Sequence, residues 1–327
     1  MLKKLINCFL ISVCFFTACR MLDDSGSDNS VRSWQYMIPE AVSGGFNAGD
    51  AEENGIDISR LAMLFNGYLN GHYRFLHGLL IVRNGSLVLE TYFGGEKMIE
   101  SSPITWEREY VTFNRDTRHY MASVTKSVVA ILIGICIDRN MISGLDQTIH
   151  PFFPEYESLF DEKKKRIQLR HLLGMTSGLE WKEGDTTAMI QSGECWSRYV
   201  LSRPMVAEPG VDWRYNDGIS VLLAEIVARV SGIRADRFAW KHLFEPIGIS
   251  SDVFWDISGF DEIGGGWGLF MTARDMARLG QLFVSRGDWN GQRIISEKWI
   301  DICWTVVVDQ PFPGSELQYG YHWWLHR

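Results

Sequence analysis

The chain has 327 residues, a formal net charge of -8, and 46% hydrophobic, 13% aromatic and 22% charged residues. Such a composition is typical of a folded globular protein, and it excludes a disordered chain, a collagen-like chain and a strongly basic binder of nucleic acid. The length exceeds the usual size of one compact core, so we expect two lobes, each able to bury an interior.

The first segment has the pattern of an export signal. Two lysines precede an uncharged apolar run from Leu5 to Ala18, which is shorter than the ~20 residues that a membrane-spanning helix needs. Small residues directly before Cys19 resemble a bacterial lipoprotein signal. We therefore expect residues 1–19 to direct export to the bacterial cell envelope, with a lipid on Cys19 as the only membrane contact, and residues 20–50 to form a flexible tether. Plain cleavage and a retained anchor are the alternatives.

Three cysteines lie in the body of the chain, at Cys136, Cys195 and Cys303. No CxxC pair or Cys/His pairing suited to zinc is present, so we expect no structural metal. Cys136 falls in an apolar helical pattern, which predicts a buried free thiol. A disulfide between Cys195 and Cys303 is the one remaining pairing, and we expect it not to form.

The first half of the body predicts a helix, a hairpin and a central helix. Asp57 precedes ISRLAMLFNGYL, which is apolar at helical spacing, and Gly71 follows it, so we expect a capped helix that opens the folded body. Two β-rich runs flank the Asn-Gly pair at 84–85, which predicts an antiparallel hairpin. The segment 123–137 is apolar almost all round, which indicates a helix buried on every side.

The second half is mostly helical in pattern between Asp146 and Trp255. The glycine loop at 264–266 precedes a further helix, for which Thr272 is the expected N-cap. SEKWIDICW predicts one more helix, and YGYHWWLHR the start of a strand. The expected domains are an α/β lobe over about 51–145 and 262–327 and a helical lobe over about 146–261, which together make one hydrolase domain over 51–327.

Ser123 is the only serine with a lysine three positions later, Lys126. At the first turn of a helix, positions three apart share a face, so the amine can approach the hydroxyl, and the exposed backbone N–H groups favour developing negative charge. We expect Lys126 to be buried and its pKa to be depressed, so that it can act as a base. Taken alone, the pair also fits an ordinary helix start with a solvated lysine.

Four ordered blocks surround this pair: MASVTKSVVAILIGICIDRN, IQLRHLLGMTSGLEW, PGVDWRYNDGISVLLAEIVARVSG and GGGWGLFMTARDMARLGQLFVSRG. In order and spacing they resemble the serine hydrolases of the class C β-lactamase, penicillin-binding-protein and esterase superfamily. The resemblance runs from about Asp57 to the end of the chain. It implies an α/β plus all-α, β-lactamase/transpeptidase-like fold, in which an antiparallel sheet is flanked by helices and the active site lies between this lobe and a helical lobe.

The resemblance also implies roles for individual residues. Ser123 matches the acylated nucleophile and Lys126 the base on the same helix. Tyr215 matches the proton shuttle between nucleophile and leaving group. Asp217 stands where relatives most often carry Asn, and a carboxylate there is expected to hold Lys126 protonated more strongly.

Two residues of the glycine loop, Gly266 and Trp267, are expected to contact substrate, with packing as the alternative role for Trp267. Relatives carry a third element after a segment like Tyr319–Trp324, a strand that supplies one N–H of the oxyanion hole, and no part of this sequence up to Arg327 matches it. We therefore expect an incomplete sheet and a C-terminally truncated or frame-shifted version of a longer enzyme. Loss of one oxyanion donor typically costs about 10²–10³ in rate.

The resulting hypothesis is an exported serine hydrolase that acts through an acyl-enzyme on a small ester or amide, without metal or organic cofactor and without a nucleic-acid partner. A β-lactam, a peptidoglycan peptide, a short-chain ester and a short amide oligomer are all open as substrates, with an esterase or amide hydrolase favoured over a true β-lactamase. The alternative is a non-catalytic penicillin-binding or sensor-like protein, or an inactive truncated fragment.

Overall fold

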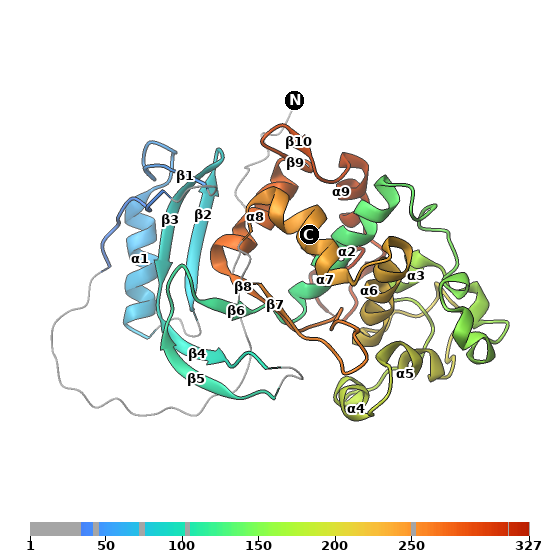
Figure 1. The fold of residues 1–327 in the computed structure, drawn as a ribbon. Helices are drawn as coiled ribbons and strands as arrows, with labels where there is room; N and C mark the ends of the chain where they lie inside the picture. Colours follow the sequence, from blue (N-terminus) through green and yellow to red (C-terminus); the bar gives the residue numbers. More distant parts are fainter. Residues whose placement is uncertain are drawn as a thin grey trace. The chain divides into compact units, whose positions relative to one another are not determined.

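The computed structural model describes residues 34–41, 46–71, 76–101, 105–249, 253–312 and 314–326 (Figure 1). The expected export signal and Cys19 lie outside the described residues. The chain divides into two compact units. Unit 1 takes in the described residues up to Met98, with Arg108–Arg118 and Thr272–Val284, and unit 2 takes in Ile99–Glu107, His119–Met271 and Ser285–Arg327.

Unit 1 contains the predicted first helix and hairpin. Helix α1 (Ile58–Leu69) is capped by Asp57, whose carboxylate accepts from two backbone N–H groups of the first turn. Strands β2 (Gly78–Arg83) and β3 (Ser86–Tyr92) pair antiparallel, and both residues of the 84–85 turn have positive φ, as a two-residue hairpin turn requires. Both predictions are confirmed.

The folded part of unit 1 begins before α1, so the expectation that this helix opens the body is wrong. Trp34 lies with its ring centroid 4.4 Å from that of Phe65 in α1, and the Tyr36 hydroxyl donates to the Val88 carbonyl. The short strand β1 (Asn47–Ala48) pairs in parallel with β3. These contacts could not be predicted from the sequence because Trp34 and Tyr36 lie in irregular backbone with no periodic pattern.

Two further pieces complete unit 1. Strands β4 (Gly94–Met98) and β5 (Arg108–Thr112) form an antiparallel pair. Helix α8 (Ala273–Val284) begins at Thr272 as predicted: the Asp275 N–H donates to the Thr272 hydroxyl, and the Thr272 N–H donates to the Asp275 carboxylate. This reciprocal pair satisfies two backbone donors that a helix start leaves free.

Unit 2 is built around the predicted central helix, α2 (Val124–Asp138), which is buried over almost its whole circumference. It packs against α6 (Asp217–Ser231), as Figure 1 shows. The predicted last helix is α9 (Glu297–Cys303), and its Trp299 indole N–H donates to the Ala130 carbonyl of α2 at 3.1 Å. Cys136 is buried in α2, as predicted, and Cys136, Cys195 and Cys303 are free thiols.

The other helical segments of unit 2 are short. They are α3 (Leu169–Leu173), α4 (Asp185–Gln191), α5 (Trp196–Ser202) and α7 (Ala235–Ala239), with the turns η1 (His150–Phe152), η2 (Pro154–Leu159), η3 (Lys164–Arg166), η4 (Trp240–Phe244) and η5 (Glu245–Ile247). A further sheet contains β6 (Arg118–Tyr120), β7 (Phe254–Trp255) and β8 (Leu269–Thr272) in the order β6-β8-β7, and β9 (Asp288–Trp289) pairs with β10 (Gln292–Arg293).

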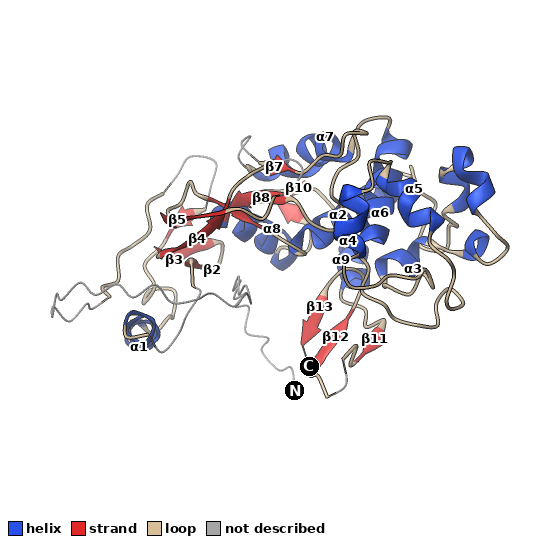
Figure 2. Cartoon of the chain, turned by 90° about the horizontal axis from the view of Figure 1, so that it is seen from below, coloured by secondary structure: helices blue, strands red, loops and turns tan. Residues whose placement is uncertain are grey.

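The last described segment forms a small antiparallel sheet of β11 (Val308–Asp309), β12 (Leu317–Tyr319) and β13 (Trp324–His326), seen below the helices in Figure 2. The pattern YGYHWWLHR predicts the start of a single strand. Instead Tyr319 pairs with Trp324 across a turn that holds His322 at a φ of 62°, so the segment is the second half of a hairpin. Within the ranges described above, no helix has the length and apolarity to cross a membrane.

Candidate functional site

The site is organised around the amine of Lys126. Its Nζ donates to Ser123 Oγ at 3.1 Å, to Asp217 Oδ1 at 2.5 Å and to the Gly266 carbonyl at 2.8 Å. A lysine ammonium has three N–H donors, so each of them has an acceptor. The Lys126 side chain is 1% exposed, which confirms the predicted burial, whereas Ser123 is exposed. The structure therefore brings together four of the predicted site residues, with the hydroxyl on the solvent side.

Local structure explains why Ser123 and Lys126 meet. Ser123 is the N-cap of α2, so Lys126 lies one turn into the helix on the same face. The apolar residues that follow bury this helix, and they carry the lysine stem into the interior. Asp217 is the first residue of α6, which Asn216 caps by accepting from the Ile219 N–H at 3.2 Å.

Glycines allow the loop 264–266 to reach the amine. A Cβ on Gly265 would lie 2.0 Å from the Ser220 carbonyl oxygen, and one on Gly266 would lie 3.0 Å from the Asp217 carbonyl oxygen. The loop thus packs its backbone directly on the first turns of α6, a closeness that only glycine permits. This contact places the Gly266 carbonyl beside Lys126.

The pKa of Lys126 is raised above its ordinary value of 10.5, so the expected depressed pKa is wrong. Burial acts to lower the pKa, but the charges of Asp217 and Tyr215 and their hydrogen bonds act together in the opposite direction and prevail. Lys126 is therefore an ammonium at neutral pH, as expected for a carboxylate at position 217. The ammonium donates a hydrogen bond to the Ser123 hydroxyl and has no lone pair with which to take the serine proton.

Two neighbours surround the ion pair. The Lys126 ammonium lies 4.7 Å from the centroid of the Tyr215 ring, within the range of a cation–π contact. The second oxygen of Asp217 accepts from the Thr186 hydroxyl of α4 at 2.6 Å. Thr186 could not be predicted from the sequence, because a threonine in a short polar helix belongs to no motif.

His322 is a second residue that sequence analysis missed. Its ring is buried, and Nδ1 donates to the Leu173 carbonyl at 2.8 Å, so Nε2 accepts from the Ser220 hydroxyl at 3.0 Å. Its own carbonyl accepts from the Ser127 hydroxyl at 2.8 Å. Burial, and then the charge of Lys126, lower the pKa of His322 to about 3. The neutral imidazole thus connects the β12–β13 turn to α3 and α6, and the His322 carbonyl connects it to α2.

Trp267, in contrast, is not brought to the amine. Its side chain is buried, its indole N–H donates to Asp256 Oδ2 at 3.2 Å, and its ring centroid lies 5.3 Å from that of Trp196. This geometry fits the packing alternative, and contact of Trp267 with substrate stays a prediction.

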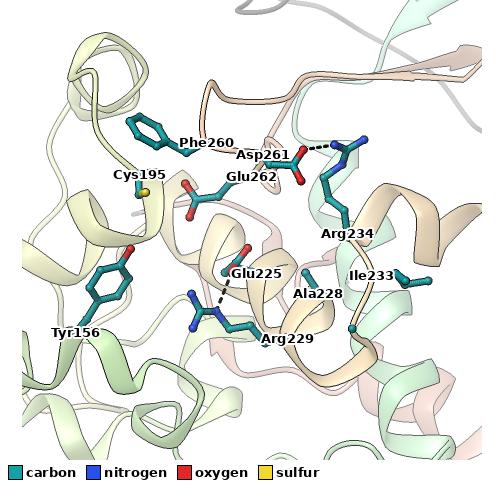
Figure 3. Close-up of a pocket in the computed structure, with 11 residues that line it drawn as sticks. Tyr156, Cys195, Glu225, Ala228, Arg229, Ile233, Arg234, Phe260, Asp261 and Glu262 are labelled. Carbon is teal, nitrogen blue, oxygen red and sulfur yellow. Dashed lines mark hydrogen bonds and ion pairs between the residues drawn. The ribbon is translucent and has the colours of Figure 1, made fainter.

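A pocket of about 430 Å³ elsewhere in unit 2 contains none of the predicted catalytic residues (Figure 3). Its charged groups largely pair within its wall: Arg229 donates to Glu225, and Arg234 pairs with Asp261. Glu262 accepts from the N–H groups at the start of α5. Across the described ranges, no group of three or more His, Cys, Asp or Glu side chains is arranged to hold a metal ion.

Comparison with known proteins assigns the chain to a family. The family model described as Beta-lactamase matches residues 76–327. A 6-aminohexanoate-dimer hydrolase from Paenarthrobacter ureafaciens is 24% identical over 251 residues, which cover 69% of this chain and 62% of that protein. Monacolin J acid methylbutanoyltransferase from Aspergillus terreus is 28% identical over 160 residues, 42% of this chain and 38% of that protein. The chain thus spans less than two thirds of either relative.

Among solved structures, the octameric penicillin-binding protein homologue from Pyrococcus abyssi superimposes with a TM-score of 0.60 and 19% sequence identity. The match covers 82% of this chain and 65% of that one. At this level of identity the likeness concerns the fold. The predicted β-lactamase/transpeptidase-like fold is confirmed.

Proposed function

The chain belongs to the β-lactamase family, and from this membership and the Lys126 site we propose that it is a serine hydrolase that forms a covalent acyl-enzyme on Ser123. The observation that carries the proposal is the contact of 3.1 Å between Ser123 Oγ, exposed at the start of α2, and the buried Lys126 amine. Its relatives include a 6-aminohexanoate-dimer hydrolase and a methylbutanoyltransferase.

In the proposed reaction, Ser123 Oγ attacks the carbonyl carbon of an ester or amide and forms a tetrahedral intermediate. The Lys126 ammonium stays charged and stabilises the developing negative charge on Oγ. Tyr215, which lies over the ammonium, carries the serine proton to the leaving oxygen or nitrogen, so the alcohol or amine departs neutral. Water then adds to the acyl carbon, which releases the acid and restores the serine hydroxyl.

Asp217 and Gly266 are positioning residues in this scheme. Both accept from the Lys126 amine, and so hold it where it donates to Ser123 Oγ. We propose a small ester or amide as substrate, with a β-lactam, a peptidoglycan peptide and a short amide oligomer as the other candidates. The named substrate of the dimer hydrolase relative supports the short-oligomer candidate.

The proposal is tested by incubating residues 21–327 with a fluorophosphonate and mapping the adduct by peptide mass. One adduct on Ser123 is expected, and it should be absent in Ser123→Ala. Ser158→Ala, at an exposed serine of η2, is the matched control and should keep the adduct. A folded chain that is not labelled would refute the proposal. Repeated product release from an ester separates an enzyme from a penicillin-binding sensor, which would stop at one equivalent.

We also propose that the chain is exported and carries a lipid on Cys19, supported by the two lysines and the apolar run Leu5–Ala18 before it. Expression of the full chain in a bacterium with radiolabelled palmitate should give a labelled protein in the membrane fraction. Cys19→Ala should remove the label, and Cys14→Ala, within the apolar run, should keep it. A wild-type chain without label would contradict lipidation.

A further inference from the structure

Three aromatic rings continue outward from the Lys126 site. The Tyr215 ring lies over the ammonium. Trp324 of β13 stacks on Tyr215, with the ring centroids 5.9 Å apart and the planes at 25°. Phe312 stacks on Trp324 at 5.8 Å and 19°. We call these three residues the aromatic ladder.

Other aromatic residues pack against the aromatic ladder, and two of its three rings stay partly exposed to solvent. Tyr319, which is 1% exposed, packs edge-on against Trp324 at 4.8 Å, and Trp213 packs edge-on against Phe312 at 5.5 Å. Trp324 is nevertheless 40% exposed and Phe312 49% exposed. The fold therefore fixes the orientation of these rings but leaves part of each in contact with solvent. An exposed apolar surface of this kind is typical of a ligand-binding face.

The place of Tyr215 in the proposed reaction decides which part of a substrate lies along these rings. The residue that delivers a proton to the leaving atom must touch that atom, so the leaving group begins at Tyr215. From there the exposed surface continues over Trp324 and Phe312. None of the three side chains carries a formal charge, so this surface favours an apolar group over an anionic one.

We propose that the aromatic ladder binds the leaving group, and that the preferred substrates are esters or amides whose alcohol or amine part is aromatic or an extended apolar chain. This inference rests on the proposed function, because it takes Tyr215 as the proton shuttle. It assigns Trp324 and Phe312 as specificity-determining residues of the same reaction.

The test compares two acetate esters with the same acyl group, ethyl acetate and 2-phenylethyl acetate, with hydrolysis followed by acid release. In the wild-type chain kcat/KM for the phenylethyl ester is expected to be about tenfold higher. Phe312→Ala and Trp324→Ala should each reduce this ratio about fivefold, the loss expected for one aromatic contact. Phe260→Ala, at an aromatic residue 50% exposed in the pocket of Figure 3, is the matched control and should keep the ratio.

Because Trp324 covers Tyr319, its alanine variant can unfold. Trp324→Leu keeps an apolar contact and should give an intermediate ratio, and thermal unfolding and labelling of Ser123 report whether each variant is folded. An ester ratio near one in the wild-type chain, or a ratio unchanged by both ladder variants, would overturn the inference even if Ser123 is labelled and both esters are hydrolysed.

A second readout needs no turnover. The affinity of 2-phenylethanol for the Ser123→Ala chain is measured by ligand-observed NMR, and adding Phe312→Ala should weaken it about fivefold. An affinity that does not change would count against the aromatic ladder. If the binding of 2-phenylethanol depends on Phe312 but Ser123 is never labelled, the proposed function is refuted. The preference for an aromatic alcohol would then still stand.

Discussion

The Lys126 ammonium and the Asp217 carboxylate lie 2.5 Å apart at a position where the lysine has lost almost all contact with water. A buried cation is stable only when its charge is compensated. Asp217 supplies that compensation, and Gly266 and Ser123 accept the two remaining N–H groups. The charge state of the amine, and with it the behaviour of Ser123, therefore depends on residue 217.

Asp217→Asn should lower the pKa of Lys126, because burial then acts without the opposing carboxylate. Because the pKa of Lys126 is raised in the wild-type chain, the ion pair stabilises the fold below about pH 10.5. This stabilisation is lost only as the pH rises through the folded-state pKa of Lys126. The variant should lose about 1.5–3 kcal/mol of unfolding free energy at pH 7. The pH profile of Ser123 labelling should shift to lower pH.

The matched control for that substitution is Asp212→Asn, at an exposed carboxylate in the same segment. Both variants are compared by urea unfolding and by labelling rates between pH 5 and 11. A profile for Asp217→Asn that coincides with the wild-type profile would show that Asp217 does not set the charge of Lys126.

Thr186→Val should slow labelling of Ser123 about fivefold, the equivalent of one hydrogen bond of about 1 kcal/mol. The Thr186 hydroxyl is the donor that orients the second oxygen of Asp217, and valine keeps the shape of the side chain while removing the donor. Thr187→Val, at the exposed neighbour, tests for effects on α4 itself and should label at the wild-type rate. Equal rates for the two variants would mean that Thr186 does not hold Asp217.

Gly265→Ala should abolish most of the activity, because its Cβ would lie 2.0 Å from the backbone oxygen of Ser220 and must push the loop away from α6. The Gly266 carbonyl would then withdraw from Lys126. Gly259→Ala is the control, since a Cβ there meets nothing within 4 Å. Labelling and ester hydrolysis are measured for both, with circular dichroism to verify folding. Full activity of Gly265→Ala would contradict the tight contact between loop and helix.

His322→Asn tests the role of the buried imidazole in acid stability. The pKa of His322 is about 3 in the fold and 6.5 when unfolded, so its neutral form stabilises the fold above pH 6.5, and stability falls as the pH drops from 6.5 towards 3. The slope from this residue is about 1.4 kcal/mol per pH unit. Asparagine tolerates the left-handed backbone at this position but does not titrate.

In urea unfolding between pH 7 and pH 4, His322→Asn should therefore be less stable than the wild-type chain at pH 7, and this difference should shrink as the pH falls. His326→Asn, at an exposed histidine of β13, should keep the wild-type slope. Parallel slopes for the wild-type and His322→Asn chains would show that the imidazole is already protonated in the fold.

The features that could be predicted from the sequence are those set by neighbouring residues. The Asp57 cap, the turn at 84–85, the all-apolar helix after Ser123 and the Thr272 cap each depend on interactions within a few positions. The four ordered blocks also predicted the fold and the residues that surround Ser123, because the resemblance depends on order and spacing along the chain.

The remaining parts of the site depend on contacts between distant segments. Thr186 is 31 positions from Asp217, and His322 is 102 positions from Ser220, with no repeating pattern that relates either pair. The predicted direction of the Lys126 pKa shift was wrong, because burial and the ion pair act on this pKa in opposite directions and only the geometry shows which effect prevails. The stacking of Trp324 on Tyr215 likewise follows from a hairpin turn that the sequence pattern did not predict.

The separation of the partners of Lys126 along the chain also has a consequence for synthesis and refolding. Asp217 lies 91 positions after Lys126, and Gly266 lies 140 positions after it. A nascent chain therefore displays Ser123 and Lys126 long before the groups that hold the amine have been made, and long-range contacts of this kind form late in folding. In a refolding experiment, reactivity of Ser123 towards a phosphonate should rise after the helical circular dichroism signal has recovered. The time course of labelling would then report when the glycine loop packs on α6.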